Sequence, residues 1–143
     1  MMSTVNDLSP ATIDVIIPQG SDIQEFYQLY ADEAQTIPLD LTVFKARAML
    51  RKTYDSKTPV LSLSSDAGTI ILGAQLVGGQ VVQGSATNGG IAILYKNLDT
   101  TNIRFQDESL ECIRDLEVYT TGVNPKVRRI VQGTVTILRE VTR

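Results

Sequence analysis

The sequence contains no histidine, no tryptophan and a single cysteine, Cys112. Without histidine, the protein has no Ser-His-Asp or Cys-His nucleophile system, no imidazole general base and no histidine-ligated metal. One cysteine can form neither an intrachain disulfide nor a cysteine-rich zinc site, so Cys112 is most simply a small buried hydrophobic residue. We therefore expect no enzymatic activity, no catalytic residues, no cofactor and no metal.

Long apolar segments and excess basic charge are also missing. The longest apolar segment, residues 69–82, is interrupted by Gly73, Gly78 and Gly79 and is shorter than the about 18–20 residues that cross a bilayer. Lysine and arginine number 13 against 16 aspartate and glutamate, a net charge of −3. Since nucleic-acid binding needs clustered basic residues, we expect neither a membrane protein nor a nucleic-acid-binding protein.

The length and composition fit one folded domain. The chain has 143 residues, of which 43% are hydrophobic and 20% charged, too apolar for a disordered chain. Residues 1–11 are polar, and Asn6, Asp7, Ser9 and Pro10 disfavour regular structure. We expect an N-terminal arm over residues 1–11 and a single β domain over residues 12–143.

Alternating apolar and polar residues, bounded by turn signals, predict short β-strands along the chain. Residues 23–30 and 44–51 also permit a helix, because both contain good helix formers. A single helical turn is expected at residues 98–103. Seven to nine strands with turns every 8–12 residues indicate an all-β sandwich or small barrel. The strands are predicted at residues 12–17, 23–30, 44–51, 60–63, 69–72, 80–83, 91–95, 111–120 and 126–141.

Residues 69–82 combine β-branched apolar side chains with little charge and no proline. An exposed strand of this kind would promote aggregation, so we expect it to be buried in the core or in a subunit contact. Arg114 and Arg129 fall in phase with apolar neighbours, which predicts either ion pairs at the rim of the sheet or an interface. The possible interface residues are Ile70, Ile71, Leu72, Leu76, Val77, Val81, Val82, Arg114 and Arg129.

Two segments have a superficial likeness to functional sites. Asp107, Glu108 and Glu111 could act in acid–base catalysis or bind a cation, but such clusters are usually solvated surface, and no calcium-loop spacing is present. The glycine-rich residues 84–90 lack the Lys-Ser/Thr ending of a phosphate-binding loop, so a flexible hairpin is expected there. The basic pairs Arg47/Arg51 and Arg128/Arg129 are typical of an exposed strand face.

Three segments together resemble a recurring domain of tailed-bacteriophage virion proteins. They are residues 13–20 (IDVIIPQG), residues 38–42 (PLDLT) running into 44–56 (FKARAMLRKTYDS), and residues 115–119 (DLEVY) followed by 129–137 (RIVQGTVTI) and 140–143 (EVTR). Small structural proteins of contractile-tailed phages, and the start of upper baseplate proteins of some lactococcal phages, have a similar pattern. This chain differs in having Val43 and Phe44 in place of Gly-Tyr, and residues 73–90 have no clear counterpart.

The resemblance implies an immunoglobulin-like β-sandwich of about seven to nine antiparallel strands without enzymatic activity. It would be present in many copies in the tail, baseplate, neck or fibre-attachment region of a virion, in contact with other virion proteins, after assembly in the host cytoplasm. Two alternatives within a virion are a receptor- or carbohydrate-binding module and a capsid decoration protein. A carbohydrate site would need exposed aromatic residues over a polar groove. A hydrolase using Asp107, Glu108 or Glu111 is a distant third hypothesis.

Overall fold

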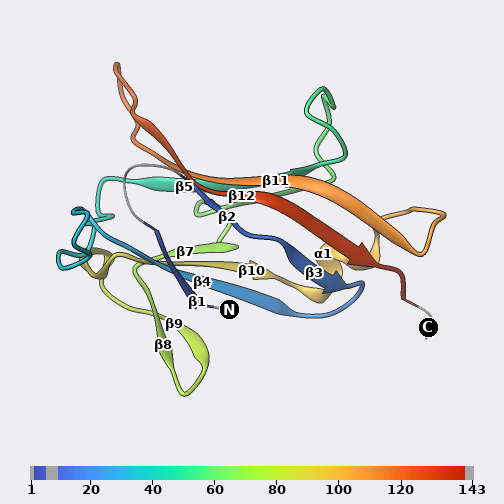
Figure 1. Ribbon diagram of the computed structural model, residues 1–143, viewed down its shortest axis with the longest axis horizontal. Helices are drawn as coiled ribbons and strands as arrows, with labels where there is room; N and C mark the ends of the chain where they lie inside the picture. Colours follow the sequence, from blue (N-terminus) through green and yellow to red (C-terminus); the bar gives the residue numbers. More distant parts are fainter. Residues whose placement is uncertain (1, 6–9, 141–143) are drawn as a thin grey trace.

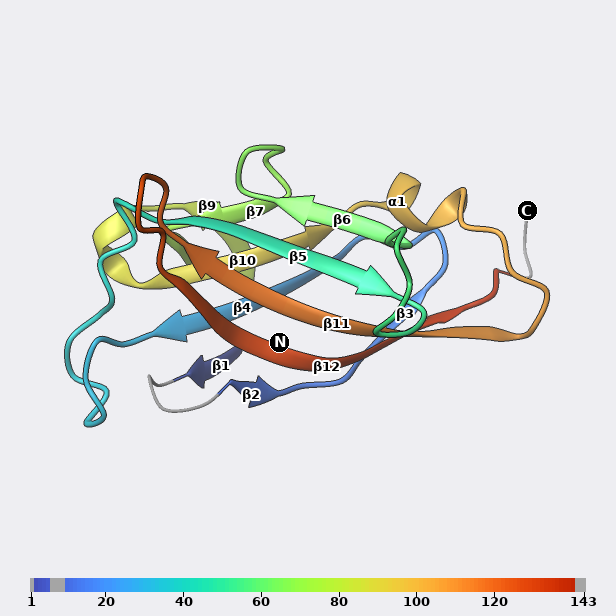
Figure 2. The same ribbon diagram turned by 90° about the horizontal axis from the view of Figure 1, so that it is seen from above.

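Two β-sheets that face each other form the body of the protein, shown in Figures 1 and 2 as a computed structural model. The structure describes residues 2–5 and 10–140. We name the layers after their central strands. The β4 sheet has the order β1 (Met2–Val5), β4 (Ile23–Leu29), β10 (Gly90–Tyr95) and β7 (Ile70–Leu72). The β11 sheet has the order β2 (Ala11–Thr12), β12 (Val127–Leu138), β11 (Ser109–Tyr119), β5 (Lys45–Arg51) and β6 (Leu61–Ser64), with β3 (Val15–Pro18) also paired to β12. The predicted all-β sandwich is confirmed.

The N-terminal segment contributes strands to both sheets. Strand β1 pairs in parallel with β4, and β2 and β3 pair in parallel with β12. The expected arrangement was antiparallel. These edge pairings are parallel because the N-terminal segment runs in the same direction as β4 where it pairs with β4, and in the same direction as β12 where it pairs with β12. The expected arm therefore includes a strand. Its residues 1 and 6–9 lie outside the described residues, as do residues 141–143 at the other end.

The core lies between the sheets and is built by residues two positions apart in each strand. In β5, Ala46, Ala48 and Leu50 are fully buried while the residues between them face outward. Strand β5 pairs with β11 on one side and β6 on the other, so the helix alternative for this segment is wrong. The same holds for β4, which pairs with β10. In both segments, burial of one face of a sheet outweighs the helix propensity of the side chains.

The expected helical turn is α1 (Asn97–Thr101), which follows β10. Thr100 is its one buried residue, and its hydroxyl accepts a hydrogen bond from the backbone N–H of Gly20 at 2.8 Å. Gln19 donates through Nε2 to the carbonyls of Thr100 and Ile103, each at 3.0 Å. These bonds fix the turn after β3 against α1. No helix within the described residues has the length and apolar character needed to cross a bilayer.

Strand β12 contains an irregularity that changes which side chains point inward. Leu116 of β11 pairs with Val131, but the next residue, Glu117, pairs with Arg129. Ile130 is therefore an extra residue in β12, the arrangement of a β-bulge, and both Ile130 and Val131 are buried. The predicted alternation that placed Arg129 on the apolar face is wrong, because the bulge turns Arg129 to the outer face.

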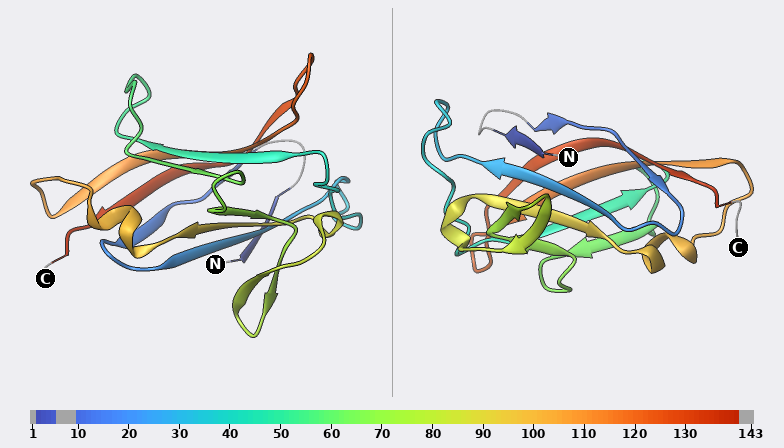
Figure 3. Two further views of the ribbon diagram at one scale, coloured as in Figure 1. Left: turned by 180° about the vertical axis from the view of Figure 1, so that it is seen from behind. Right: turned by 90° about the horizontal axis from the view of Figure 1, so that it is seen from below.

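Residues 69–82 form no continuous strand. The chain leaves β7 at Gly73, whose φ is +81° and where a Cβ would lie 2.7 Å from the backbone of Ser85. It then forms a hairpin of β8 (Ala74–Val77) and β9 (Gln80–Gln83), closed by two glycines with positive φ, as two-residue hairpin turns require. Figure 3 shows this hairpin on the outer side of the β4 sheet. Ala74 and Val81 pack there against Phe26, Ala92 and Ile71.

Candidate functional site

The outer face of the β11 sheet carries a groove of about 270 Å³ that we call the β11 groove. Its floor is made by side chains that alternate with the buried residues of β5, β11 and β12, and one end is lined by a residue of the loop between β5 and β6. The lining mixes polar and apolar side chains and includes three outward-facing arginines and two carboxylates. The groove is lined by Arg47, Met49, Arg51, Tyr54, Ile113, Arg114, Asp115, Glu117, Arg129 and Gln132.

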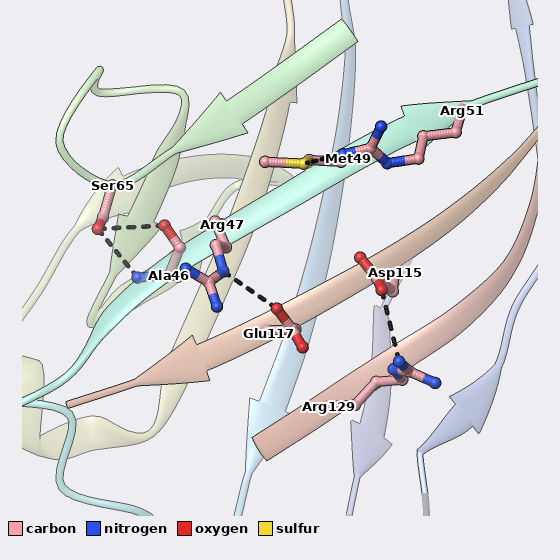
Figure 4. A network of polar contacts seen from close by, with 8 residues as sticks. All are labelled: Ala46, Arg47, Met49, Arg51, Ser65, Asp115, Glu117 and Arg129. Carbon is pink, nitrogen blue, oxygen red and sulfur yellow. Dashed lines mark hydrogen bonds and ion pairs between the residues drawn. The ribbon is translucent and has the colours of Figure 1, made fainter. Parts of the chain in front are cut away.

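One ion pair in the groove lies across strands β5 and β11 (Figure 4). Arg47 and Glu117 are directly opposite in the register, and Arg47 Nε donates to Glu117 Oε1 at 3.0 Å. The guanidinium also lies over the ring of Tyr119, 4.4 Å from its centre, a distance at which a cation is attracted to the aromatic face. Arg47 is therefore held in a defined position by two contacts.

A second, looser pair joins β11 to β12. Arg129 Nη2 lies 3.7 Å from Asp115 Oδ2, and Figure 4 shows the two side chains pointing toward one another. Partial burial raises the pKa of the Asp115 carboxyl above its ordinary value, with a further upward contribution from Glu117; Arg129, Arg47 and Arg51 act in the opposite direction. Because the net shift is upward, the attraction of these arginines does not fully offset the cost of removing the Asp115 carboxylate from water.

Arg51 differs from the other two arginines of the groove. Its Nη1 donates to the carbonyl of Ser56 at 2.7 Å, and its Nη2 lies 3.3 Å from the sulfur of Met49. None of the carboxylates in the described part of the chain forms an ion pair with it. Nearby, Tyr54 lines the groove with 87% of its surface exposed. A positioned cation and an exposed aromatic ring thus lie at the same groove.

Arg114 points the other way, into the core. Its Nη1 donates to Glu25 Oε1 and, at 3.2 Å, to the hydroxyl of Tyr95, while Nη2 donates to the carbonyl of Ile13 at 2.9 Å. The hydroxyl of Tyr27 donates to the other oxygen of Glu25. We call Glu25, Tyr27, Tyr95 and Arg114 the buried polar cluster. It joins β4 and β10 of one sheet to β11 of the other and to the link between β2 and β3.

Burial sets the chemistry of this cluster. The side chains of Arg114 and Glu25 are 0% and 1% exposed, so the expected position of Arg114 at a rim or an interface is wrong. Burial raises the pKa of both Tyr27 and Tyr95 above the ordinary value, and the Glu25 carboxylate raises it further. Both hydroxyls therefore stay protonated and remain available as donors. Glu25 was missed in the sequence, although it is in phase with the buried Tyr27 and Leu29 of β4.

The apolar residues proposed for an interface differ in how far they are buried. Ile70 belongs to the core between the sheets, and Ile71 and Val81 pack in the small cluster under the hairpin. Leu72 is half-buried against the main core. Leu76, Val77 and Val82 are exposed to 39%, 57% and 36%, and we call these three the hairpin surface. The register puts Val77 and Val82 on the face of the hairpin turned away from Val81, and Leu76 on the same face as Val81. Of the proposed interface residues, this last group and the half-exposed Arg129 are the most exposed, while Ile71, Leu72 and Val81 are half-buried.

The other residues singled out in the sequence do not come together into a binding or catalytic site within the described part of the chain. Asp107, Glu108 and Glu111 are exposed, and the described residues contain no group of three His, Cys, Asp or Glu side chains that could hold a metal ion. Residues 84–89 connect β9 to β10 and contain a short 3₁₀ helix (Ala86–Asn88). Because β9 pairs with β8 while β10 pairs with β4 and β7, the expected hairpin there is wrong. Cys112 is fully buried, and burial raises its thiol pKa.

Comparisons with solved structures give neighbours of low similarity, two of which are described below. No family model and no curated protein matches the sequence. The "N-terminal domain of phage TP901-1 ORF48" superposes with a TM-score of 0.45 at 11% identity, over 98% of this chain and 99% of that one. AggA, the major subunit of aggregative adherence fimbriae type I from Escherichia coli, has a TM-score of 0.30 at 8% identity, over 92% and 91%. Neither match identifies a family for this chain.

Proposed function

We propose that this protein is a non-enzymatic structural subunit of a bacteriophage virion that assembles through the hairpin surface. The observation that carries the proposal is a hairpin held against the outside of the β4 sheet with Leu76, Val77 and Val82 exposed at its surface. The resemblance to phage virion proteins supplies the setting, and it covers residues 13–20, 38–42, 44–56, 115–119, 129–137 and 140–143. Exposed apolar side chains grouped on one element are typical of protein–protein contacts.

The energetics favour a repeated assembly over a stable isolated dimer. Complete burial of a valine or leucine side chain contributes about 1.5–3 kcal/mol, so burying the exposed parts of these three side chains supplies about 2–4 kcal/mol per copy. A dimer that buries this surface on both copies gains about 4–8 kcal/mol. Association alone costs an estimated 4–15 kcal/mol in lost translational and rotational freedom. The hairpin surface is therefore sufficient only when other contacts act with it, as in a particle that holds many copies.

We further propose that the protein belongs to the tail, baseplate or neck region and contacts other virion proteins there. A mass-spectrometric inventory of purified particles, with the stoichiometry of this chain, tests this placement. A stoichiometry equal to that of known tail or baseplate components is expected. Absence of the chain from purified particles, or a copy number matching the major capsid protein, would refute the placement.

The contact itself is tested by one substitution and a matched control. Val77→Asp puts a charge into the hairpin surface, where its burial against a partner is unfavourable. Val123→Asp makes the same change in the β11–β12 loop, where the valine is 95% exposed. We expect Val77→Asp to reduce incorporation into particles at least tenfold and Val123→Asp to leave it unchanged. Both variants should melt within a few degrees of the original protein, which separates assembly from folding.

Normal incorporation of a folded Val77→Asp variant would refute the role of the hairpin surface. Equal loss with both variants would show that any added negative charge disturbs assembly, which would also refute it. Dilute solutions of the original protein should contain monomers, measured by light scattering. A stable dimer that Val77→Asp does not dissociate would show that another surface dominates.

A further inference from the structure

We propose that the β11 groove binds a saccharide that carries a carboxylate. This goes beyond the structural role proposed above and concerns the opposite side of the molecule. Three features of the groove favour such a ligand: an exposed aromatic ring, an arginine held in place with no carboxylate partner among the described residues, and two ion pairs that supply donors and acceptors side by side.

The aromatic ring is that of Tyr54. It lines the groove and is 87% exposed, although burial of a tyrosine ring in the core or a contact is normally favourable. A tyrosine side chain offers a flat apolar surface with few rotatable bonds, so little conformational entropy is lost when a ligand packs on it. The C–H face of a sugar ring is a partner of the matching size and flatness.

The charged partner is Arg51. Its guanidinium has five N–H donors, and the described residues account for one bond to the Ser56 carbonyl and one contact with the Met49 sulfur. These contacts orient the guanidinium and leave donors free for a ligand. A planar guanidinium with free donors binds a carboxylate through two parallel hydrogen bonds.

The centre of the groove suits hydroxyl groups. Arg47–Glu117 and Arg129–Asp115 place a donor beside an acceptor on neighbouring strands. A sugar hydroxyl both donates and accepts, so it can bond to either member of such a pair without leaving a buried charge unmatched. With Arg51 included, three arginines face two carboxylates, and the groove keeps one positive charge on a protein whose net charge is −3.

Other ligand classes fit less well. An extended peptide that adds a strand needs an open sheet edge, but β11 is paired with β5 and β12 along the groove. A nucleic acid needs many basic contacts along its phosphates, and the groove has one excess positive charge. A saccharide with one carboxylate requires only the side chains that are present.

The proposal is tested first with an immobilised array of neutral, uronic-acid-containing and sialic-acid-containing oligosaccharides. We expect the full-length protein to bind the carboxylate-bearing oligosaccharides in preference to their neutral counterparts. Calorimetry with the best-bound oligosaccharide then measures four variants. Loss of a hydrogen-bonded charge or of a stacked ring weakens binding about tenfold or more, so Arg51→Gln and Tyr54→Ala should each do so. Tyr54→Phe, which keeps the ring, should bind within about twofold of the original protein.

Lys45→Gln is the matched charge control. Lys45 lies on the same strand as Arg51 but pairs with Asp66 outside the groove, so removing its charge should leave binding unchanged. Thermal melting of each variant verifies folding. The proposal is overturned if no oligosaccharide binds, if neutral and acidic oligosaccharides bind equally, or if folded Tyr54→Ala binds normally. Equal affinity for a hexaglutamate peptide would also overturn it, in favour of an acidic peptide ligand. None of these outcomes bears on the hairpin surface.

Discussion

The buried polar cluster leads to a quantitative prediction about stability. Arg114→Met removes the cation from Glu25 and leaves the Tyr95 hydroxyl and the Ile13 carbonyl without their arginine donor. Breaking a buried ion pair by removing one partner costs about 3–5 kcal/mol, because a charge remains buried without compensation. The total stability of a domain of this kind is about 5–15 kcal/mol. We therefore expect a lower melting temperature by about 10–15 °C.

A fourfold substitution separates the net contribution of the Glu25–Arg114 ion pair to stability from the cost of removing only one of its partners. Glu25→Leu, Arg114→Met, Tyr27→Phe and Tyr95→Phe together remove both charges and both hydroxyls, leaving one carbonyl, that of Ile13, without its side-chain donor. Apolar replacement of a whole buried ion pair is often neutral or stabilising, and one unsatisfied carbonyl costs about 1–3 kcal/mol. The fourfold variant should therefore lie within about 2 kcal/mol of the original protein. No described residue accepts a hydrogen bond from Arg114 Nε, which makes the cluster easier to replace.

Urea unfolding followed by far-ultraviolet circular dichroism measures these differences, since the protein has no tryptophan to report them. Arg129→Met is the control, because its side chain is half exposed and its ion pair spans 3.7 Å. Exposed pairs contribute less than about 1 kcal/mol, so this variant should be nearly as stable as the original. If Arg114→Met lost no more stability than Arg129→Met, the cluster would not hold the sheets together. If the fourfold variant were no more stable than Arg114→Met, the loss in Arg114→Met would not come from an uncompensated buried charge on Glu25.

Three further predictions concern single positions. Gly133→Ala should cost more than about 2 kcal/mol in urea unfolding, because its Cβ would lie 2.3 Å from the Ile13 carbonyl oxygen; Gly122→Ala, where φ is also positive but the space is open, should cost less. Because the folded protein raises the pKa of Asp115, the stability linked to this carboxyl is present below its unfolded pKa of about 3.9 and is lost as pH rises through the higher folded value. Asp115→Asn should therefore melt at or above the original protein at pH 7, with a smaller difference at pH 3.5; a lower melting point at pH 7 would contradict this. Cys112 should resist thiol reagents at pH 8 until urea unfolds the chain, because it is buried with a raised pKa; rapid labelling of the folded protein would contradict its burial.

The strands were predictable where one face is buried and the other is not. In residues 44–51 the two-residue alternation places Ala46, Ala48 and Leu50 inward, as found. The same alternation correctly placed Arg114 on the inner face of β11. Its partner could not be found in this way, because Glu25 is 89 positions away and strand pairing between distant segments is not encoded in local periodicity.

The errors arise where backbone geometry interrupts the alternation. One extra residue at Ile130 reverses the faces of β12 before it, and a shift of one residue exchanges inner and outer side chains. At Gly73 the chain turns out of β7 because the backbone of Ser85 lies too close for any Cβ. Ser85 belongs to the connection that follows the hairpin, so this requirement appears only in the folded structure. The β11 groove was missed for a related reason: its side chains come from three separate segments that pairing brings together.

The two sheets present outer faces of opposite chemistry, and this difference limits what each can do. The hairpin covers apolar residues of the β4 sheet, while the β11 sheet keeps a bare face of arginines and carboxylates. Figure 1 places the hairpin below the lower layer and the β11 sheet in the upper layer, so a partner on the hairpin surface would not cover the groove. On the two proposals above, a subunit anchored through its hairpin would still expose its groove. Since substitutions at distant sites with no shared contacts act additively, Val77→Asp should leave saccharide binding unchanged and Tyr54→Ala should leave incorporation unchanged.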